Sequence, residues 1–227
     1  MLAFDSTGPC VTVGLARDGA ALGRWDEATR KTQGNVLDRL IDRALAELGW
    51  SRHDIEGLAL VTGPGSLTAT RLGWATAAGW GQSADIPITG WPTPVVHHRQ
   101  WRESRNSEPG GTRTSFCLVH HRGDSFYCYR FLRHELPGPP IAITLGQWSP
   151  GERPAKIIGP GIIGYRERWR HALPSDVELA DDQECIVGGD LLAAWGEADL
   201  AAGRRLPLDS SPLDYGLPPD FRRVNDL

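Results

Sequence analysis

The chain has 227 residues, of which 40% are hydrophobic and 23% are charged. This is an ordinary globular composition, which excludes disordered and fibrous classes and allows one large core or two small ones. The formal net charge of −4 argues against direct RNA binding, which usually needs a basic excess. No apolar run approaches the ~20 residues of a membrane span, and the start has no secretory leader. We therefore expect a cytoplasmic protein without direct membrane contact.

The first part of the chain predicts three consecutive antiparallel strands. Short β-rich runs cover residues 2–5, 10–15 and 20–25, and glycine-containing turns separate them. A helix over 35–48 follows, because its apolar residues recur at three- and four-residue steps. A buried strand over 58–61, a second helix over 66–82 and a strand over 87–90 complete the series.

This order, β-β-β-α-β-α-β, predicts a mixed sheet in which a three-strand meander is joined to parallel strands. It is the order of the ribonuclease H-like and actin-like ATPase folds. The second half looks abbreviated: residues 99–113 read as a polar linker, 114–119 and 125–132 as a strand pair, and 190–202 as a helix. We predict an N-terminal subdomain over 1–98 and a smaller one over 99–227, which includes the C-terminal helix and an extended tail.

The second predicted helix has almost no charged face, with Arg71 as the exception. A helix that is apolar all round must be covered on more than one side. Ala69, Gly73 and Ala77 are small and four residues apart, so they would let another helix approach closely. The cover is either another part of this chain or a second protein, and the pattern leaves both open.

No residue set predicts catalysis, and we expect no cofactor. Gly63–Ser66 lies between a strand and a helix, as a phosphate loop does, but the lysine that a P-loop needs is missing, so we favour a structural turn with Ser66 as the N-cap. Asp5 and Asp124 stand where an actin-like ATPase could place acidic residues. A second phosphate hairpin is missing, so we favour turn aspartates for both.

Metal binding is also not expected. The pairs His97-His98 and His120-His121 are adjacent in sequence, so the two rings of a pair diverge on a helix or a strand and do not clasp one ion. The four cysteines are far apart and contain no CxxC pair, which disfavours a zinc site or a disulfide framework.

Two stretches resemble the TsaB family. Residues 2–7 and 10–15 resemble its opening strand pair, and residues 54–73 resemble its Gly-Pro-Gly-Ser-Phe-Thr-Gly-x-Arg-x-Gly signature. Leu67 and Ala69 replace the aromatic residue and a glycine of that signature, so the chain is identified as a divergent member. The resemblance covers about residues 1–95.

The resemblance implies an inactive actin-like protein that supports threonylcarbamoyl transfer to adenosine 37 of tRNA. It implies a TsaD-like catalytic subunit and a TsaE-like ATPase as partners, contact with tRNA only through the complex, and pairing through the first two helices. We also expect a possible homodimer through the same surface. The residues predicted for this interface are Val36, Leu37, Leu40, Ile41, Ala44, Thr70, Gly73, Trp74 and Ala77.

Two other functions stay open. One is an enzyme, either an actin-like ATP-dependent enzyme or a glycoprotease-type peptidase, for which magnesium-dependent ATP binding is the test. The other is an RNA-binding module that uses the basic and aromatic stretch around Arg99 to Arg105.

Overall fold

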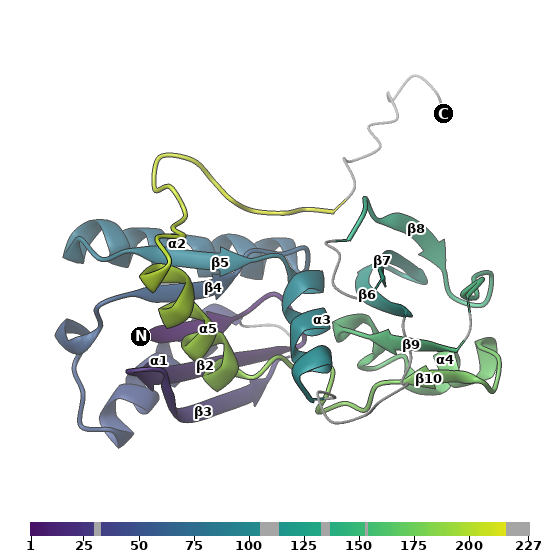
Figure 1. Cartoon of the computed structure of the whole chain (residues 1–227), viewed down its shortest axis with the longest axis horizontal. Helices are drawn as coiled ribbons and strands as arrows, with labels where there is room; N and C mark the ends of the chain where they lie inside the picture. Colours follow the sequence, from purple (N-terminus) through teal and green to yellow (C-terminus); the bar gives the residue numbers. More distant parts are fainter. Residues whose placement is uncertain (30–32, 105–113, 133–136, 153, 217–227) are drawn as a thin grey trace.

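The computed structural model describes residues 1–29, 33–104, 114–132, 137–152 and 154–216 (Figure 1). The first sheet has the order β3-β2-β1-β4-β5 and the second has the order β10-β9-β6-β7-β8. The first sheet contains β1 (Leu2–Asp5), β2 (Cys10–Arg17), β3 (Ala20–Ala28), β4 (Leu58–Val61) and β5 (Ile88–Trp91). The second contains β6 (Thr114–Arg122), β7 (Ser125–Leu132), β8 (Ile141–Thr144), β9 (Ala155–Ile158) and β10 (Val177–Leu179).

The helices are α1 (Gln33–Glu47), α2 (Leu67–Ala84), α3 (Thr93–Ser104), α4 (Arg166–Ala172) and α5 (Gly189–Ala201), with short 3-10 turns η1 (Arg52–Asp54) and η2 (Pro160–Ile162). None of the helices in the described residues is long and apolar enough to cross a membrane.

The two sheets repeat one topology. In each, an antiparallel meander (β1-β2-β3 or β6-β7-β8) is extended by two parallel strands (β4 and β5, or β9 and β10). The predicted fold class is therefore confirmed, including the abbreviated second half: the described residues between β8 and β9 contain no helix, where the first sheet has α1. The repeat is one of topology, because the two halves have no recognisable sequence repeat.

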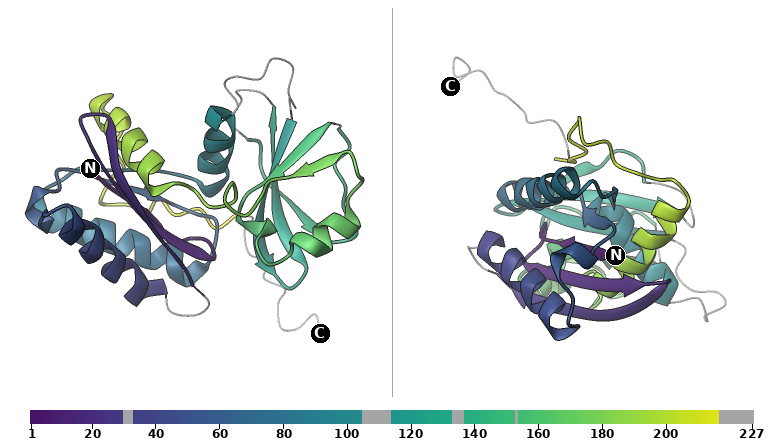
Figure 2. Two further views of the ribbon diagram at one scale, coloured as in Figure 1. Left: turned by 90° about the horizontal axis from the view of Figure 1, so that it is seen from below. Right: turned by 90° about the vertical axis from the view of Figure 1, so that its left-hand side faces the viewer.

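The first sheet lies between two layers of helices (Figure 2). Successive side chains of a strand point to opposite faces. Leu2 and Phe4 pack with α1 and α2, whereas Ala3 packs with α5. Complete burial of a large apolar side chain contributes about 1.5–3 kcal/mol, so both faces of this sheet stabilise the fold.

Two helices cross between the halves. Helix α3 follows β5 of the first sheet and packs on β6 and β9 of the second, with Trp101 in the second core. Helix α5 follows β10 of the second sheet and covers strands β1 to β5 of the first. The sequence prediction grouped this C-terminal helix with the second part, but its contacts lie on the first sheet.

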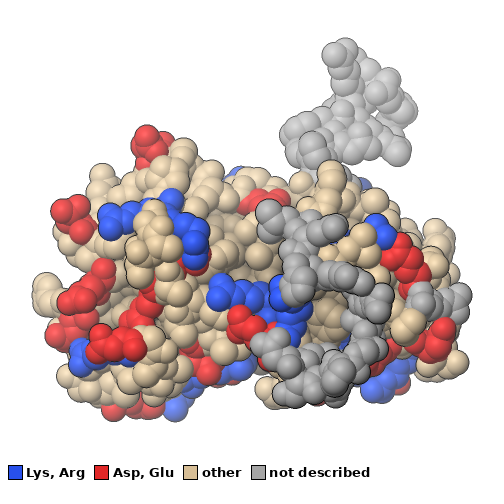
Figure 3. Space-filling model, in the orientation of Figure 1, with Lys and Arg blue, Asp and Glu red and all other residues tan. Residues whose placement is uncertain are grey.

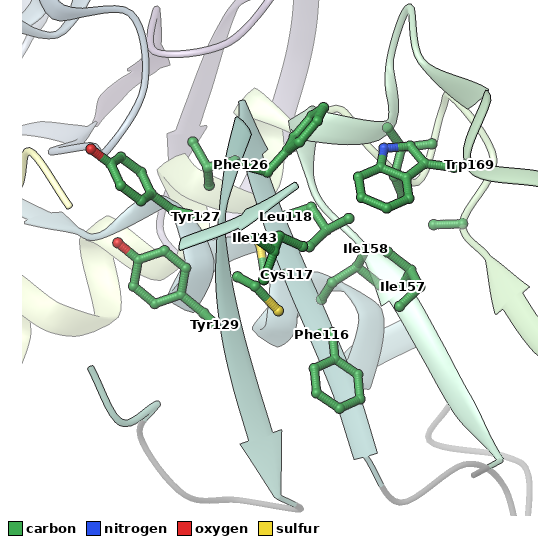
Figure 4. Close-up of a cluster of buried hydrophobic side chains, with 14 of the residues drawn as sticks. Phe116, Cys117, Leu118, Phe126, Tyr127, Tyr129, Ile143, Ile157, Ile158 and Trp169 are labelled. Atoms are coloured by element: carbon green, nitrogen blue, oxygen red, sulfur yellow. The ribbon is translucent and has the colours of Figure 1, made fainter. Parts of the chain in front are cut away.

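The second core is rich in aromatic residues (Figure 4). Trp169 of α4 is fully buried and packs edge-on against Phe126 of β7, with ring centroids 5.0 Å apart. Strand β9 lies beside β6 and contributes Ile157 and Ile158. Aromatic pairs of this geometry add about 0.5–1.5 kcal/mol beyond their buried area. This core explains how a half with only one short helix of its own is held together.

Residues 93–104 differ from the prediction. The expected polar linker from residue 99 is the end of α3, and the rest of that segment, 105–113, lies outside the described residues. The helix forms because Pro94 is well suited to a first helical turn and because Val96 and Trp101 are buried. The proposed RNA-binding stretch around Arg99 is therefore helical, and Arg105 lies outside the described residues.

Candidate functional site

The residues predicted for a partner interface lie mostly in the chain's own core. All but Trp74 are buried, and those of α1 pack against the first sheet. The buried ones are Val36, Leu37, Leu40, Ile41, Ala44, Thr70, Gly73 and Ala77. These eight residues are therefore covered by their own chain, and a contact surface on α1 and α2 stays a prediction that needs other residues of these helices on the outside.

The small-residue stripe of α2 faces the sheet, because the helix lies very close to it. A Cβ atom at Gly73 would lie 2.8 Å from Ser6 Oγ and 3.5 Å from Phe4 Cε2. Ser6 Oγ also donates a hydrogen bond to the carbonyl oxygen of Ala69 at 2.9 Å. The stripe therefore permits close packing of the helix on its own sheet, and the neighbouring helix that the sequence suggested is not needed for it.

The opposite face of α2 remains uncovered and nearly uncharged. Leu67 is 51% exposed, and Ala75 and Gly79 are also exposed. Leu72, Thr76 and Ala78 are half-buried between them. We call these six residues the outer face of α2. Arg71 is the only charged residue of α2.

Helix α1 differs, since its exposed side is charged. Asp38, Arg39, Asp42 and Arg43 are all exposed, and Arg43 pairs with Glu47 on the same helix. Such a face is well solvated and needs no cover. The two helices lie side by side under the sheet, so the uncharged surface belongs to α2 alone.

The C-terminal segment contacts the start of α2. The Arg71 guanidinium lies 5.7 Å from the centre of the Tyr215 ring, and the Asp214 amide donates to the Thr62 carbonyl oxygen at 2.9 Å. Gly63 is also covered here, because a Cβ atom on it would lie 2.3 Å from the Asp214 carbonyl oxygen. Residues 214–215 thus partly shield the first turn of α2.

The Gly63–Ser66 loop before α2 is engaged within the protein. The Ser66 amide donates to the Thr7 carbonyl oxygen at 2.8 Å, and the Thr93 hydroxyl donates to the Pro64 carbonyl oxygen at 2.7 Å. A Cβ atom at Gly65 would lie 2.4 Å from Thr7 O, so glycine is required for this contact. The interpretation as a structural turn is confirmed. Ser66 is the N-cap residue, but its side chain makes no capping hydrogen bond, contrary to the prediction.

The two candidate aspartates are also engaged. Asp5 Oδ1 accepts a hydrogen bond from the Thr7 amide at 2.7 Å, and burial raises the pKa of the Asp5 carboxyl to about 6. Both oxygens of Asp124 accept from the Arg168 guanidinium at 2.7 Å. This ion pair holds the pKa of Asp124 below its usual value. Both residues are satisfied turn aspartates, as the sequence suggested.

The two histidine pairs lie on different elements, His97-His98 on α3 and His120-His121 on β6. His97 is buried in α3, and burial lowers the pKa of its ring to about 4, so it is neutral near pH 7. His98 Nδ1 lies 2.9 Å from Ser115 Oγ, and its ring stacks on Phe131. On the second sheet, His120 contacts Tyr165 through Nε2 at 3.0 Å. Within the described residues, no group of three His, Cys, Asp or Glu side chains could hold a metal ion.

Comparisons with known proteins agree with this fold. A family model described as TsaD, tRNA N6-adenosine threonylcarbamoyltransferase, matches residues 27–112. The tRNA threonylcarbamoyladenosine biosynthesis protein TsaB of Escherichia coli is 28% identical over 167 residues, which are 73% of this chain and 65% of that protein. The chain thus spans less than two thirds of the length of this curated relative.

Two solved structures from Pseudomonas aeruginosa are similar over nearly the whole chain. One is an uncharacterized protein with similarity to peptidase YeaZ, with a TM-score of 0.72 and 19% identity over 95% of this chain and 98% of that chain. The other is YeaZ, with a TM-score of 0.70 and 21% identity over 94% and 98%. The class is therefore an α/β protein of the actin-like ATPase fold. The chain is thus similar in sequence to TsaB and in fold to YeaZ.

Proposed function

We propose that this protein is a non-catalytic partner subunit in the biosynthesis of threonylcarbamoyladenosine at position 37 of tRNA in the cytoplasm. It binds a TsaD-like catalytic subunit through the outer face of α2, and a TsaE-like ATPase joins the assembly. The names of the E. coli relative and of the matching family support this role. In the absence of the catalytic subunit, the same face supports a homodimer.

The observation that carries the proposal is the exposed side of α2, which contains Leu67, Ala75 and Gly79 and has Arg71 as its one charged residue. Exposed apolar residues gathered on one helix face mark association surfaces, whereas single ones are ordinary. The set contains the exposed residues Leu67, Ala75 and Gly79, which the half-buried Leu72 and Ala78 flank. Its small residues would let a partner helix approach closely.

Gly79 adds an independent argument. A Cβ atom at this position would meet nothing within 4 Å, so packing inside the chain does not require a glycine. A glycine inside a helix costs about 0.5–1 kcal/mol relative to alanine. Close approach of another protein at Gly79 supplies a reason for keeping it.

The engaged polar groups argue against an enzyme. The Ser66 amide is bonded to Thr7 O, and the Asp124 carboxylate is paired with Arg168, so neither is available to a phosphate or a metal ion without rearrangement. The alternative of an actin-like ATP-dependent enzyme or a peptidase finds no support in these contacts. Magnesium-dependent ATP binding in calorimetry would revive it.

The test uses Ala75→Arg and Gly79→Arg, which place a long charged side chain on the outer face of α2 without entering the core. Ala201→Arg, at the exposed end of α5, is the matched control. Each purified protein is mixed with the TsaD-type protein of the same genome, and the mass of the complex is measured by light scattering after size exclusion. We expect complex formation with the wild type and the control, and at least tenfold weaker association for the α2 variants, about 1.4 kcal/mol.

Nucleoside mass spectrometry of tRNA from cells that carry each variant gives the functional readout. Loss of the modification with Gly79→Arg, but not with Ala201→Arg, supports the proposal. Normal modification in cells that lack this protein altogether would reject the role in tRNA modification. Unchanged association of both α2 variants would reject this surface.

A further inference from the structure

A cavity of about 370 Å³ lies on the other face of the first sheet, at its β5 edge. Strand β5, helix α3, helix α5 and the segment after α5 form its walls. It is separated from the outer face of α2 by the sheet itself, because α2 and α5 cover opposite faces (Figure 2). Any ligand of this cavity is therefore independent of the proposed partner surface.

Two tryptophans form an apolar floor and are held in place by hydrogen bonds. The rings of Trp91 and Trp195 meet edge to face, with centroids 6.2 Å apart. Trp91 Nε1 donates to Asp199 Oδ2 at 2.9 Å, and Trp195 Nε1 donates to Glu103 Oε2 at 3.0 Å. Trp195 is 5% exposed and the Arg99 guanidinium lies over its ring, so the surface for a flat group is offered by the half-buried Trp91 ring, which its bond to Asp199 holds in place.

Three arginines surround this floor, namely Arg99, Arg204 and Arg205. The Arg99 guanidinium lies 4.2 Å from the centre of the Trp195 ring and uses only Nε in its bond to Glu103. Lys and Arg atoms lie at the level of α5 and beside α3 in the space-filling view (Figure 3).

The arginines retain unused donors. Arg204 bonds to Asp199 through Nη2, and Arg205 makes no ion pair with any residue that the structure describes. A guanidinium has five N–H donors, so most donors of all three remain available to an anion. Two arginines are oriented by carboxylates and the third carries an unbalanced charge, so the cavity is suited to a ligand of opposite sign.

The edge of β5 supplies a backbone donor. Leu58 donates to Pro87 O and Thr62 donates to Trp91 O, so the odd-numbered peptide groups of β5 face β4. Leu206 donates to Ile88 O on the other edge. By the two-residue alternation of a strand, the N–H and C=O of Gly90 also point to that edge, where Gly90 lines the cavity.

We propose that this cavity binds a small organic anion with a flat apolar group, of the chemical class of a nucleoside monophosphate. The base packs on the exposed part of the Trp91 ring, and the phosphate accepts hydrogen bonds from Arg205 and the remaining donors of Arg99 and Arg204. A volume near the lower end of the range for ligand sites fits one nucleotide. An aromatic ring favours a base and arginines favour a phosphate, and a nucleoside monophosphate is a ligand that uses both.

The test titrates the full chain with adenosine monophosphate, adenosine and inorganic phosphate, and follows binding by calorimetry. Shifts of the indole N–H signals of Trp91 and Trp195 in NMR spectra show whether the ligand binds in this cavity. We expect saturable binding of the monophosphate with shifts of both signals, and binding at least tenfold weaker for adenosine or phosphate. Arg205→Gln should weaken the monophosphate roughly tenfold, because one charge-assisted bond is lost.

Arg122→Gln is the matched control, since Arg122 is also exposed but lies on the second sheet. Its affinity should equal that of the wild type. No binding of the monophosphate, equal affinity for adenosine, or equal loss in both arginine variants would overturn the proposal. Gly79→Arg should bind the monophosphate normally, and Arg205→Gln should still associate with the catalytic subunit, so failure of one proposal is distinguishable from failure of the other.

Discussion

The backbone of Gly14 in β2 lies directly against that of Gly189 at the start of α5. A Cβ atom at Gly14 would lie 1.9 Å from the carbonyl carbon of Gly189, and a Cβ atom at Gly189 would lie 2.5 Å from that of Val13. This contact seats α5 on the first sheet. Gly14→Ala should therefore lower the free energy of unfolding by about 2–3 kcal/mol, measured by urea denaturation.

Gly79→Ala is the counterpart, because its new methyl group meets nothing in the chain. We expect an increase in stability of about 0.5–1 kcal/mol. Equal stability of Gly14→Ala and the wild type would mean that α5 can shift without a loss of free energy. That result would contradict the close contact of Gly14 with Gly189 as the one that positions α5.

Asp5 and His97 should make opposite contributions to the pH dependence of stability. The folded state keeps the Asp5 proton up to a pKa of about 6 rather than 3.8, so this group lowers the free energy of unfolding as pH rises between those values. The folded state accepts a proton on His97 only below a pKa of about 4 rather than 6.5, so this group raises the free energy of unfolding as pH rises between those values.

Two variants separate these contributions. Asp5→Asn keeps an acceptor for Thr7 and should make stability rise more steeply from pH 4 to 6 than in the wild type, by about 1–3 kcal/mol over the window. His97→Gln should change the slope in the opposite direction. Chemical denaturation at several pH values measures both, and parallel curves for all three proteins would contradict the assignment.

Lys156 is 2% exposed and pairs with two partly exposed carboxylates. Its Nζ lies 2.5 Å from Glu178 Oε1 and 3.1 Å from Glu184 Oε2. Either Glu178→Gln or Glu184→Gln should cost about 1 kcal/mol, because the other carboxylate remains. The double variant should cost about 3 kcal/mol, more than the sum, since a buried ammonium group then lacks a counter-charge. Glu167→Gln, in an exposed pair with Arg170, is the control and should cost little.

The Tyr129 hydroxyl is buried and has no hydrogen-bond partner in the described part of the chain. Tyr127 and Tyr129 lie on one face of β7 (Figure 4). Removing an unsatisfied polar group from a core should help, so Tyr129→Phe is expected to raise stability by about 1 kcal/mol. A thermal unfolding scan gives the answer. A loss of comparable size would indicate that the hydroxyl does have a partner.

Much of the first half was predictable from the sequence because its patterns are regular. The strand over 58–61 is predicted with its observed bounds, and α1 and α2 are predicted to within two residues. The apolar repeat of α1 also identifies its buried face correctly, since Leu37, Leu40 and Ile41 lie in the core. The same residues were also predicted to contact a partner, and their burial leaves them little surface for it.

The orientation of α2 could not be predicted in the same way. Its residues are apolar or small on every side, so periodicity does not distinguish the face on the sheet from the outer face. The distinguishing fact is a distance: Gly73 lies so close to Ser6, and Gly81 to Ile88, that side chains at the two glycines would collide with these residues. Such proximity depends on the sheet, and the helix sequence alone does not contain it.

The second half was only partly predictable because β8, β9 and β10 are short and α4 is small. Strand β9 has Lys156 in a buried position, which interrupts the apolar run that would predict a buried strand. Helix α4 has two turns at most. The pocket residues were missed for another reason. Trp91, Trp195 and Arg205 are far apart in sequence and meet only because α5 returns to the first sheet.

Helix α3 follows the first sheet but packs on the second, and α5 follows the second sheet but packs on the first. Each half of the molecule therefore depends on the other to cover its sheet. If the chain were cut between residues 98 and 99, the first piece would keep its sheet but lose the helix over Ala3 and Ala59. The second piece would lose the first half of α3, including His98, whose ring stacks on Phe131 of β7. Neither piece should be stable by itself. The two together should reassemble, because each piece carries helical residues that cover the sheet of the other.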